Sequence, residues 1–427
     1  MNNKLFIFMN FNWKKILAVI GFTVATIGLA YLLYFLFFKP APEVIIPETP
    51  EETVSGQLPS AGKGVQKPTE ETTPSETFLP VSGPILRPPA PLPAQVSEIA
   101  QGGSTWAATL TQKPAKAVTL SEDGQNLQYY DKSEGKFYRI TPDGKTTILS
   151  DKIFKDVDKV NWAPNANKAV LEFPDGSNVV FDFATQKQIT LPKHWEKFDF
   201  SPDSTQISGI SMGVSPDNRW LFTANADGTN AQTIEPVGEN GDKVKVSWSP
   251  NNQIIATSRT GEAQGFDRQM ILMVGKNGEN YKGLMVEGWG FDYKWSPTGK
   301  NILYNVYNSA SDYKPLLWIS GAQGDNIGEG RKSLGINTWA EKCDYSDENT
   351  IYCAVPQNLE RGAGMAPSLS NYTPDIFYKI DLKTGLKSVI ATPYPNKTAE
   401  SLTVSPDGQY LFFTDKGSGQ LNRIRLR

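Results

Sequence analysis

The sequence predicts an all-β fold over residues 105–427, because short runs of β-branched and aromatic residues alternate there with tight-turn motifs. The clearest motif is an apolar residue followed by Ser-Pro and then Asp, Asn or Thr. Proline fixes the second position of such a turn, and Asp, Asn and Gly tolerate the positions after it. Whole or looser copies have their Ser or Ala at Ser121, Ala163, Ser201, Ser249, Ser296, Ser346 and Ser405.

These marks are about 38 to 59 residues apart, which is the period of propeller blades. One blade reads as four strands at 244–248, 253–257, 269–274 and 281–286. The sequence therefore predicts a seven-bladed β-propeller. Six and eight blades stay open as alternatives, because Ser215-Pro216-Asp217 is an additional copy of the motif inside blade three. We interpret that copy as a loop between the second and third strands.

The last blade contains only three strand-like runs, and a missing strand would leave an open sheet edge, which proteins avoid. The run 105–111 has the composition of a strand and precedes the first full blade. We expect it to close the ring by pairing with the last blade. The turn motif resembles the TolB-type, WD40-like propeller repeats over about residues 105–427. That resemblance implies the fold and carries little information about activity, and the chain lacks the N-terminal α/β domain of TolB.

Residues 16–38 form an uncharged apolar stretch that is long enough to span a bilayer as one transmembrane helix. Lys4, Lys14 and Lys15 precede it, so the positive-inside rule places residues 1–15 in the cytoplasm. Residues 39–104 are rich in Pro, Glu, Thr and Ser, which predicts a disordered linker. We therefore expect a single-pass protein of the cell membrane whose propeller is extracytoplasmic, either periplasmic or at the cell surface.

The two cysteines, Cys343 and Cys353, flank the turn of blade six symmetrically. They are expected to face each other across a hairpin and to form a disulfide, which an extracytoplasmic location permits. The alternative is a pair of buried thiols in neighbouring strands.

The sequence offers little that indicates catalysis, so we predict a protein that is not an enzyme and has no cofactor and no metal. Its one histidine, His194, excludes His-rich metal centres. The G-x-S-x-G pattern around Ser211 lacks the strand-to-helix turn that a hydrolase nucleophile requires. Asp123 and Asp227 could ligate calcium, but each also fits an ordinary turn. A net charge of −3 without a basic patch excludes a nucleic-acid footprint.

The connections between second and third strands are long in four successive blades, and in a propeller all of them lie on one face. These insertions cover 212–218, 261–267, 308–314 and 356–373. Long loops on a rigid scaffold are where binding residues concentrate. We expect partner-binding anchors at Arg361, Met365, Tyr313, Arg268 and Phe266, followed by Trp289 and Trp195.

The predicted function is therefore that of a membrane-tethered propeller that binds a protein partner of the cell envelope through this loop-rich face. An alternative is a sensor that binds a small ligand or a glycan in the central funnel. An enzyme of a type that the sequence does not reveal is a third alternative. The long loops could also be insertions that have accumulated without any binding role, in which case no partner is needed to explain them.

Overall fold

The computed structural model describes residues 21–32 and 95–427, and the chain divides into two units, Met1–Ile85 and Leu86–Arg427. In the first unit, residues 21–32 form a helix with exposed side chains. Within the described ranges, the helices fall short of the length and apolar character needed to cross a membrane. The rest of the predicted span, 16–20 and 33–38, lies outside the described residues, as does the linker over 39–94.

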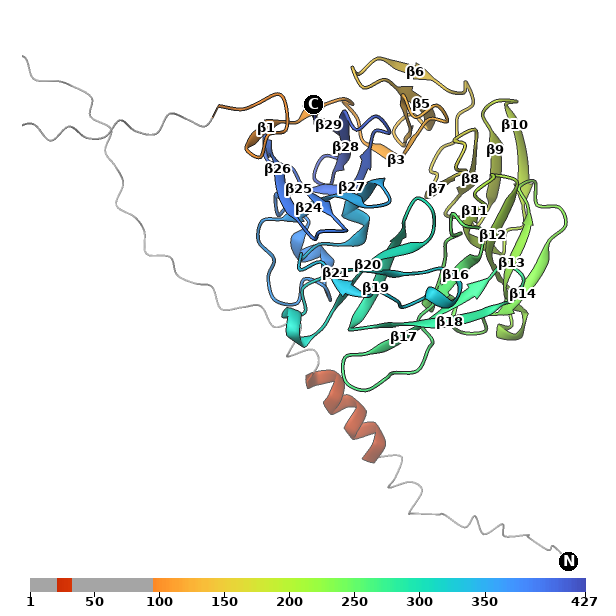
Figure 1. Cartoon of the computed structure of the whole chain (residues 1–427). Coiled ribbons are helices and arrows are strands. Elements are labelled where there is room, and N and C mark those ends of the chain that lie inside the picture. Colours follow the sequence, from red (N-terminus) through yellow and green to blue (C-terminus); the bar gives the residue numbers. More distant parts are fainter. Residues whose placement is uncertain (1–20, 33–94) are drawn as a thin grey trace, which may run out of the picture. The chain divides into compact units, whose positions relative to one another are not determined.

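The second unit is a seven-bladed β-propeller, as the turn spacing predicted, with its sheets arranged around a centre (Figure 1). Blade one contains β3 (Ala115–Leu120), β4 (Leu127–Asp131), β5 (Lys136–Ile140) and β6 (Thr146–Ile148). Blade two contains β7 (Lys159–Trp162), β8 (Lys168–Glu172), β9 (Asn178–Asp182) and β10 (Lys187–Leu191). Blade three contains β11 (Trp195–Phe200), β12 (Gln206–Met212), β13 (Arg219–Asn225) and β14 (Gln232–Pro236). Blade four contains β15 (Val244–Val246), β16 (Ile254–Ser258), β17 (Gln269–Gly275) and β18 (Asn280–Val286).

The remaining blades repeat this antiparallel order. Blade five contains β19 (Trp289–Trp295), β20 (Asn301–Tyr307), β21 (Leu316–Gly321) and β22 (Lys332–Ser333). Blade six contains β23 (Cys343–Asp347), β24 (Thr350–Pro356), β25 (Asp375–Asp381) and β26 (Lys387–Tyr394). Blade seven contains β27 (Ala399–Val404), β28 (Tyr410–Asp415) and β29 (Leu421–Arg425). Short 3-10 turns lie in the connections: η1 (Pro216–Asn218), η2 (Gly241–Lys243), η3 (Ser309–Ser311), η4 (Gly324–Asn326), η5 (Ala340–Lys342) and η6 (Pro367–Ser370).

The ring is closed by the N-terminal run, but that run is divided between two blades. β2 (Ala108–Thr109) pairs antiparallel with β29 and supplies the fourth strand of blade seven, as expected. β1 (Ser104–Trp106) instead pairs parallel with β26 of blade six. Ala100, which we assigned to the linker, donates its backbone N–H to the carbonyl of Arg425 at 2.8 Å. The described end of the expected linker therefore belongs to the propeller.

The Ser-Pro-Asp turns owe their recurrence to one hydrogen-bond arrangement. Ser405 Oγ donates to Asp407 Oδ1 at 2.6 Å and accepts the backbone N–H of Tyr410 at 2.9 Å. The serine thus joins the two strands that the turn connects, while the aspartate holds the turn itself. The same pair of bonds recurs at Ser121, Ser201 and Ser249.

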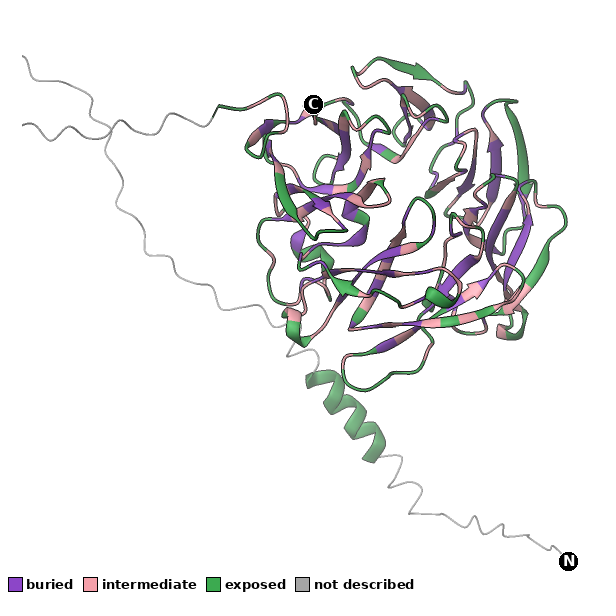
Figure 2. Cartoon of the chain, viewed as in Figure 1, coloured by how far each residue is buried: buried purple, intermediate pink, exposed green. Residues whose placement is uncertain are grey.

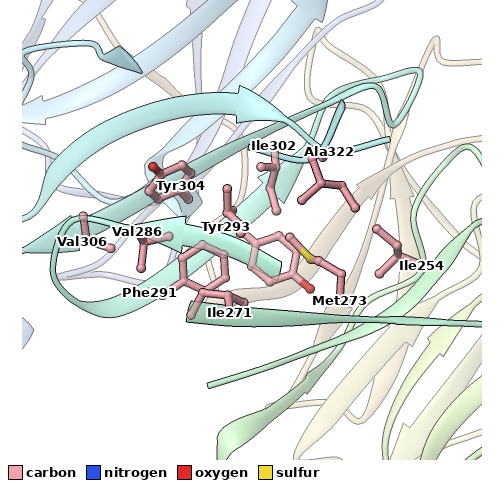
Figure 3. Close-up of a cluster of buried hydrophobic side chains, with 12 residues drawn as sticks. Ile254, Ile271, Met273, Val286, Phe291, Tyr293, Ile302, Tyr304, Val306 and Ala322 are labelled. Carbon is pink, nitrogen blue, oxygen red and sulfur yellow. The ribbon is translucent and has the colours of Figure 1, made fainter. Parts of the chain in front are cut away.

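The core lies between the blades. Second strands such as β4 and β16 are buried along their whole length, whereas the outermost strand β6 is exposed throughout (Figure 2). A second strand is flanked by two strands and covered by a neighbouring blade on each face, so its side chains have no route to water. Figure 3 shows one such cluster, in which Ile271 and Val286 of blade four pack with Phe291 of blade five.

Tryptophans at the ends of innermost strands join successive blades. The indole N–H of Trp162 donates to the carbonyl of Ala117 in blade one at 2.7 Å. That of Trp295 donates to Ser247 Oγ in blade four at 3.1 Å. Trp248 packs with residues of blades three and four. These indoles therefore serve the packing of the ring.

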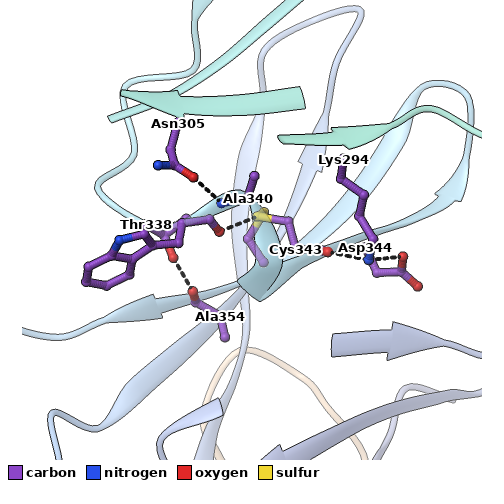
Figure 4. Close-up of a disulfide and its surroundings, with 9 residues drawn as sticks. Lys294, Asn305, Thr338, Ala340, Cys343, Asp344 and Ala354 are labelled. Carbon is purple, nitrogen blue, oxygen red and sulfur yellow. Dashed lines mark hydrogen bonds and ion pairs between the residues drawn. A yellow bond between two sulfur atoms is a disulfide. The ribbon is translucent and has the colours of Figure 1, made fainter. Parts of the chain in front are cut away.

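The two cysteines form a disulfide that lies inside blade six. Cys343 of β23 and Cys353 of β24 are directly opposite in register, their Cα atoms 4.1 Å apart, and both are fully buried. Hydrogen bonds surround the bridge (Figure 4). Thr338 Oγ1 donates to the carbonyl of Ala354 at 2.6 Å, and Asn305 Oδ1 of blade five accepts the N–H of Ala340 at 2.9 Å.

Candidate functional site

The long connections leave the ends of second strands and form one loop-rich face. They cover residues 213–218, 259–268, 308–315 and 357–374, in blades three to six. Because second strands run in the same direction in all blades, these loops emerge on the same side. The Ser215-Pro216-Asp217 copy of the turn motif lies in the first of them and not in a blade of its own.

Hydrogen bonds join three of these loops into a continuous ridge, which we define as residues 259–268, 308–315 and 357–374. Ser309 donates its N–H and its Oγ to Asp267 Oδ2, at 3.2 and 2.7 Å. Gly362 N–H donates to the carbonyl of Asp312 at 2.9 Å, and Gly364 N–H to that of Tyr313 at 2.8 Å. The loop of blade three bonds to its own blade through Arg219 Nε and the carbonyl of Gly213. The ridge is therefore cross-braced between blades four, five and six.

Most of the anchors expected from the sequence lie exposed on this ridge. Phe266 is 87% exposed and Met365 is 62% exposed. Arg361 is exposed, and its guanidinium carbon lies 6.0 Å from the centre of the half-buried Tyr313 ring. At that distance the ring holds the cation by a cation–π contact. The structure thus brings Arg361 and Tyr313 together as a pair.

Arg268 ends the first segment of the ridge and is exposed, whereas Trp289 lies outside the ridge. Arg268 Nε donates to Glu287 Oε2 at 2.8 Å, and the same carboxylate accepts a bond from Arg331 at 2.9 Å. This arginine is therefore already paired within the protein. Trp289 begins β19 and is 38% exposed.

The placement of Trp195 among the anchors is wrong. It begins β11, is 8% exposed, and its ring centre lies 4.1 Å from that of Phe222. Its side chain points into the cluster between blades two and three, where it packs with Val170 and Leu191. Burial makes this tryptophan a core residue.

Three exposed apolar residues on the loop face were not selected from the sequence. Val214 is fully exposed, Tyr372 is 86% exposed and Leu369 is 55% exposed. Their signal was present, because each is a large apolar residue inside one of the long insertions. Exposed apolar residues that gather on one face mark interaction sites.

A pocket of about 480 Å³ opens in the central funnel on this same face, and we call it the funnel pocket. Blades four, five and six supply its walls, and the loop of blade six supplies part of its rim. Its lining includes Lys243, Arg259, Phe291, Tyr307, Glu341 and Met365. Met365 lines the pocket and also belongs to the ridge, so the two features are continuous.

Two glycines hold Tyr307 in the wall of the pocket. A Cβ atom on Gly290 would lie 2.3 Å from Tyr307 Cε1, and one on Gly364 would lie 2.7 Å from Tyr307 Cβ. Gly290 also has a φ of +68°, which favours glycine. The tyrosine is therefore packed directly against backbone on both sides.

The charges of the pocket differ in how far they are neutralised by the protein. Lys245 Nζ of blade four is paired with Asp292 of blade five and lies 4.6 Å from the centre of the Tyr293 ring. Arg259 donates one bond, at 3.0 Å, to the carbonyl of Asp242. Within the described part of the chain, the carboxylate of Glu341 has neither a hydrogen bond nor an ion pair. The surrounding walls and then the Asp292 carboxylate raise the pKa of Glu341.

The residues considered for catalysis and metal binding lie in strands, turns and connections of the propeller. Ser211 lies within the strand β12, and His194 is exposed in the connection between blades two and three. Asp123 Oδ1 accepts the N–H of Gln125, and Asp227 Oδ1 accepts that of Thr229, both at 3.0 Å. Among the residues described, clusters of three or more His, Cys, Asp or Glu with the geometry of a metal site do not occur.

No protein-family model and no curated protein sequence matches the chain. Among solved structures, it is similar to an oligogalacturonate lyase in complex with manganese, at 14% identity and a TM-score of 0.50, over 75% of this chain and 90% of that one. It is similar to the oligogalacturonate lyase of Vibrio parahaemolyticus at 11% identity and a TM-score of 0.50, with the same coverage. It also matches TolB from Acinetobacter baumannii at 13% identity and a TM-score of 0.41, over 67% and 66% of the two chains. TolB is thus among the solved propellers that resemble the chain, and the similarity to the two lyases speaks for the fold alone.

Proposed function

We propose that the protein is a non-enzymatic binding module that captures a protein partner through the ridge of blades four to six. The observation that carries this proposal is the combination of exposed anchors with loops that are hydrogen-bonded to one another across blades. Aromatic residues, Met and Arg are enriched in interface cores. A ridge already ordered before binding loses little entropy on association, which favours affinity.

We also propose that the module is displayed outside the cytoplasm on a membrane tether. The sequence of residues 16–38 is uncharged and apolar, and it follows three lysines. The disulfide Cys343–Cys353 supports an oxidising compartment. The partner would then be another protein of the cell envelope, which the linker allows the propeller to reach at a distance from the bilayer.

The partner surface that fits the ridge is apolar with acidic groups at its margin. Phe266, Met365 and Tyr372 offer apolar area, and Arg361 offers a guanidinium already oriented over Tyr313. Arginine in this orientation suits a carboxylate, which it can engage by two parallel hydrogen bonds.

The test compares serine substitutions of exposed apolar residues on the two faces. Met365→Ser with Phe266→Ser should reduce capture of the envelope partner, measured by chemical crosslinking in intact cells, by about tenfold or more. Leu386→Ser is the matched control, because Leu386 is 66% exposed in the connection between the third and fourth strands of blade six, on the opposite face. Equal capture by both variants would contradict the proposal.

A second candidate function is the binding of a small ligand in the central funnel. The pocket of about 480 Å³, with polar groups from three blades, favours this candidate. Its size lies in the range of small-molecule sites. An enzymatic role has less support, because the sole histidine of the chain does not line this pocket.

A further inference from the structure

The funnel pocket carries groups of opposite charge on the two blades that flank blade five, and none of these groups has an ion-pair partner among the described residues. Blade six contributes the exposed Glu341, whose carboxylate lacks a hydrogen bond and an ion pair in the described residues. The charges of Lys416, Lys245 and Lys342 act on it from a greater distance. Blade four contributes the exposed Arg259 and Lys243. Lys243 Nζ donates to the amide oxygen of Asn240 at 3.1 Å, and Arg259 Nη2 donates to a backbone carbonyl. Across residues 21–32 and 95–427, neither cation is paired with a carboxylate.

Asp242 adds a further acid on the blade-four side, so that side carries one net positive charge from Lys243, Arg259 and Asp242. The remaining charges, Lys245 and Asp292, neutralise each other. The pocket therefore has a cationic side and an anionic side. A ligand that carries both charges would form ion pairs with both sides, whereas a neutral sugar would form an ion pair with neither.

Between the charged sides, the wall is aromatic and apolar. Phe291 and Tyr307 come from blade five, and Met365 and Pro367 come from the loop of blade six. Trp339 lies next to Glu341 in the chain and also lines the pocket. An ammonium group close to Glu341 would thus meet a carboxylate and aromatic rings together, which is favourable for a cation.

The volume indicates the length of the ligand. A sphere of this volume is roughly 10 Å across, which corresponds to about three extended residues at 3.3–3.6 Å each. A single amino acid would leave most of the pocket empty, and a long peptide would have to leave it through the rim.

We propose that the funnel pocket binds a short peptide with free termini, its ammonium group at Glu341 and its carboxylate at Arg259 and Lys243. This inference rests on the second candidate function, a ligand in the funnel, and names its chemical class. Phe291, Met365 and Pro367 receive the side chains between the termini. The contact of Met365 with both the pocket and the ridge places the bound peptide next to the partner-binding surface.

The test is equilibrium dialysis of the purified full-length chain in detergent micelles against a Gly-X-Gly mixture, read by mass spectrometry. Three forms of the mixture are compared: with free termini, N-acetylated and C-amidated. We expect retention of the free form and at least about tenfold weaker retention of each capped form, because each loses one charge-assisted contact. Equal retention of all three forms would overturn the proposal.

Two variants assign the ends of the peptide. Glu341→Gln should abolish the preference for the free over the acetylated form, and Arg259→Gln the preference for the free over the amidated form. Glu360→Gln is the matched control, because Glu360 is an exposed glutamate on the blade-six loop that supplies Met365, and it does not line the pocket. A loss of preference in Glu360→Gln as large as in Glu341→Gln would count against the assignment.

Dialysis against maltotriose, a neutral oligosaccharide, distinguishes a failure of the peptide proposal from a failure of the candidate function on which it rests, the binding of a small ligand in the funnel. Retention of maltotriose without retention of peptides, lost in Met365→Ser, would overturn the peptide and keep a ligand in the funnel. Retention of neither probe would contradict both statements.

Discussion

The backbone N–H of Gly364 in blade six donates to the carbonyl oxygen of Tyr313 in blade five at 2.8 Å. This bond fixes the longest loop of the propeller on its neighbour, next to the Arg361–Tyr313 contact. Since Gly364 and Met365 also line the funnel pocket, the same segment shapes the ridge and the pocket. Its position should therefore control both kinds of binding.

A methyl group at position 364 should displace this loop. In Gly364→Ala, the new Cβ would lie 2.7–2.8 Å from three atoms of Tyr307, which is itself packed against Gly290. We expect a loss of about 1–3 kcal/mol in the free energy of unfolding, typical of overpacking. Limited trypsin digestion should also cut faster after Arg361. Gly103→Ala is the control, because nothing lies within 4 Å of that Cβ position, and an equal response of both variants would refute the assignment.

The pH dependence of stability should contain a contribution from Asp199. Burial raises the pKa of this carboxyl to about 6, although the N–H groups of Trp248 and Phe200 donate to it and lower the pKa in part. The folded protein therefore binds this proton more tightly than the unfolded chain, so its contribution to stability is present at low pH and is lost as pH rises from about 4 to 6.

Asp199→Asn isolates that contribution, because the amide is neutral at every pH and its oxygen can still accept the Trp248 N–H, bonded at 2.6 Å in the native protein. Urea titrations at pH 4 and pH 7 give the unfolding free energy of the native protein relative to that of the variant. This difference should be smaller at pH 7 than at pH 4 by about 2 kcal/mol. A difference that does not change with pH would show that Asp199 titrates normally.

The ion pair between Lys342 and Asp375 should be essential for stability. Lys342 Nζ lies 2.7 Å from Asp375 Oδ1, and the two side chains are only 6% and 0% exposed. Asp375 Oδ2 also accepts the N–H of Ala399, at the start of blade seven. Lys342→Met leaves a buried carboxylate without its cation, and we expect a loss of about 3–5 kcal/mol in urea denaturation.

The exposed pair of Lys193 and Asp175 provides the comparison for that variant. Its side chains are 68% and 63% exposed, so Lys193→Met should change the unfolding free energy by less than about 1 kcal/mol. Similar small losses for both lysines would mean that the buried pair contributes no more than a surface pair.

Removal of the disulfide should lower stability by an amount set by its short loop. The cysteines are 10 residues apart, for which loop-closure entropy gives about 3 kcal/mol. Cys343→Ala with Cys353→Ala should show this loss in chemical denaturation, and reductant should then have no further effect. A variant as stable as the oxidised native protein would contradict the entropic argument.

The sequence predicted the blades well, because their signals are local. In several turns the serine bonds only to groups within five residues of it, as Ser405 does to Asp407 and Tyr410, so the motif contains its own structural cause. The disulfide was predictable for a similar reason, since a symmetric hairpin sets the register of Cys343 and Cys353.

The features that the sequence did not reveal depend on distant parts of the chain. The run 105–111 reads as one strand, but β1 and β2 pair with β26 and β29, about 290 and 310 residues away, in two different blades. Trp195 is of a residue type that is common in interfaces, but it is buried because its ring packs against Phe222. In the described residues Glu341 has no ion pair because Lys245, which lines the same pocket, pairs with Asp292, and this depends on residues about 50 positions apart.

The most direct test of partner binding by the ridge is photocrosslinking in intact cells with a photoreactive residue at position 361. We expect one protein of the cell envelope to be captured there and to be lost when the probe moves to position 298. Thr298 is exposed in the turn between the first and second strands of blade five, on the opposite face. Capture at neither position, or equal capture at both, would contradict the account.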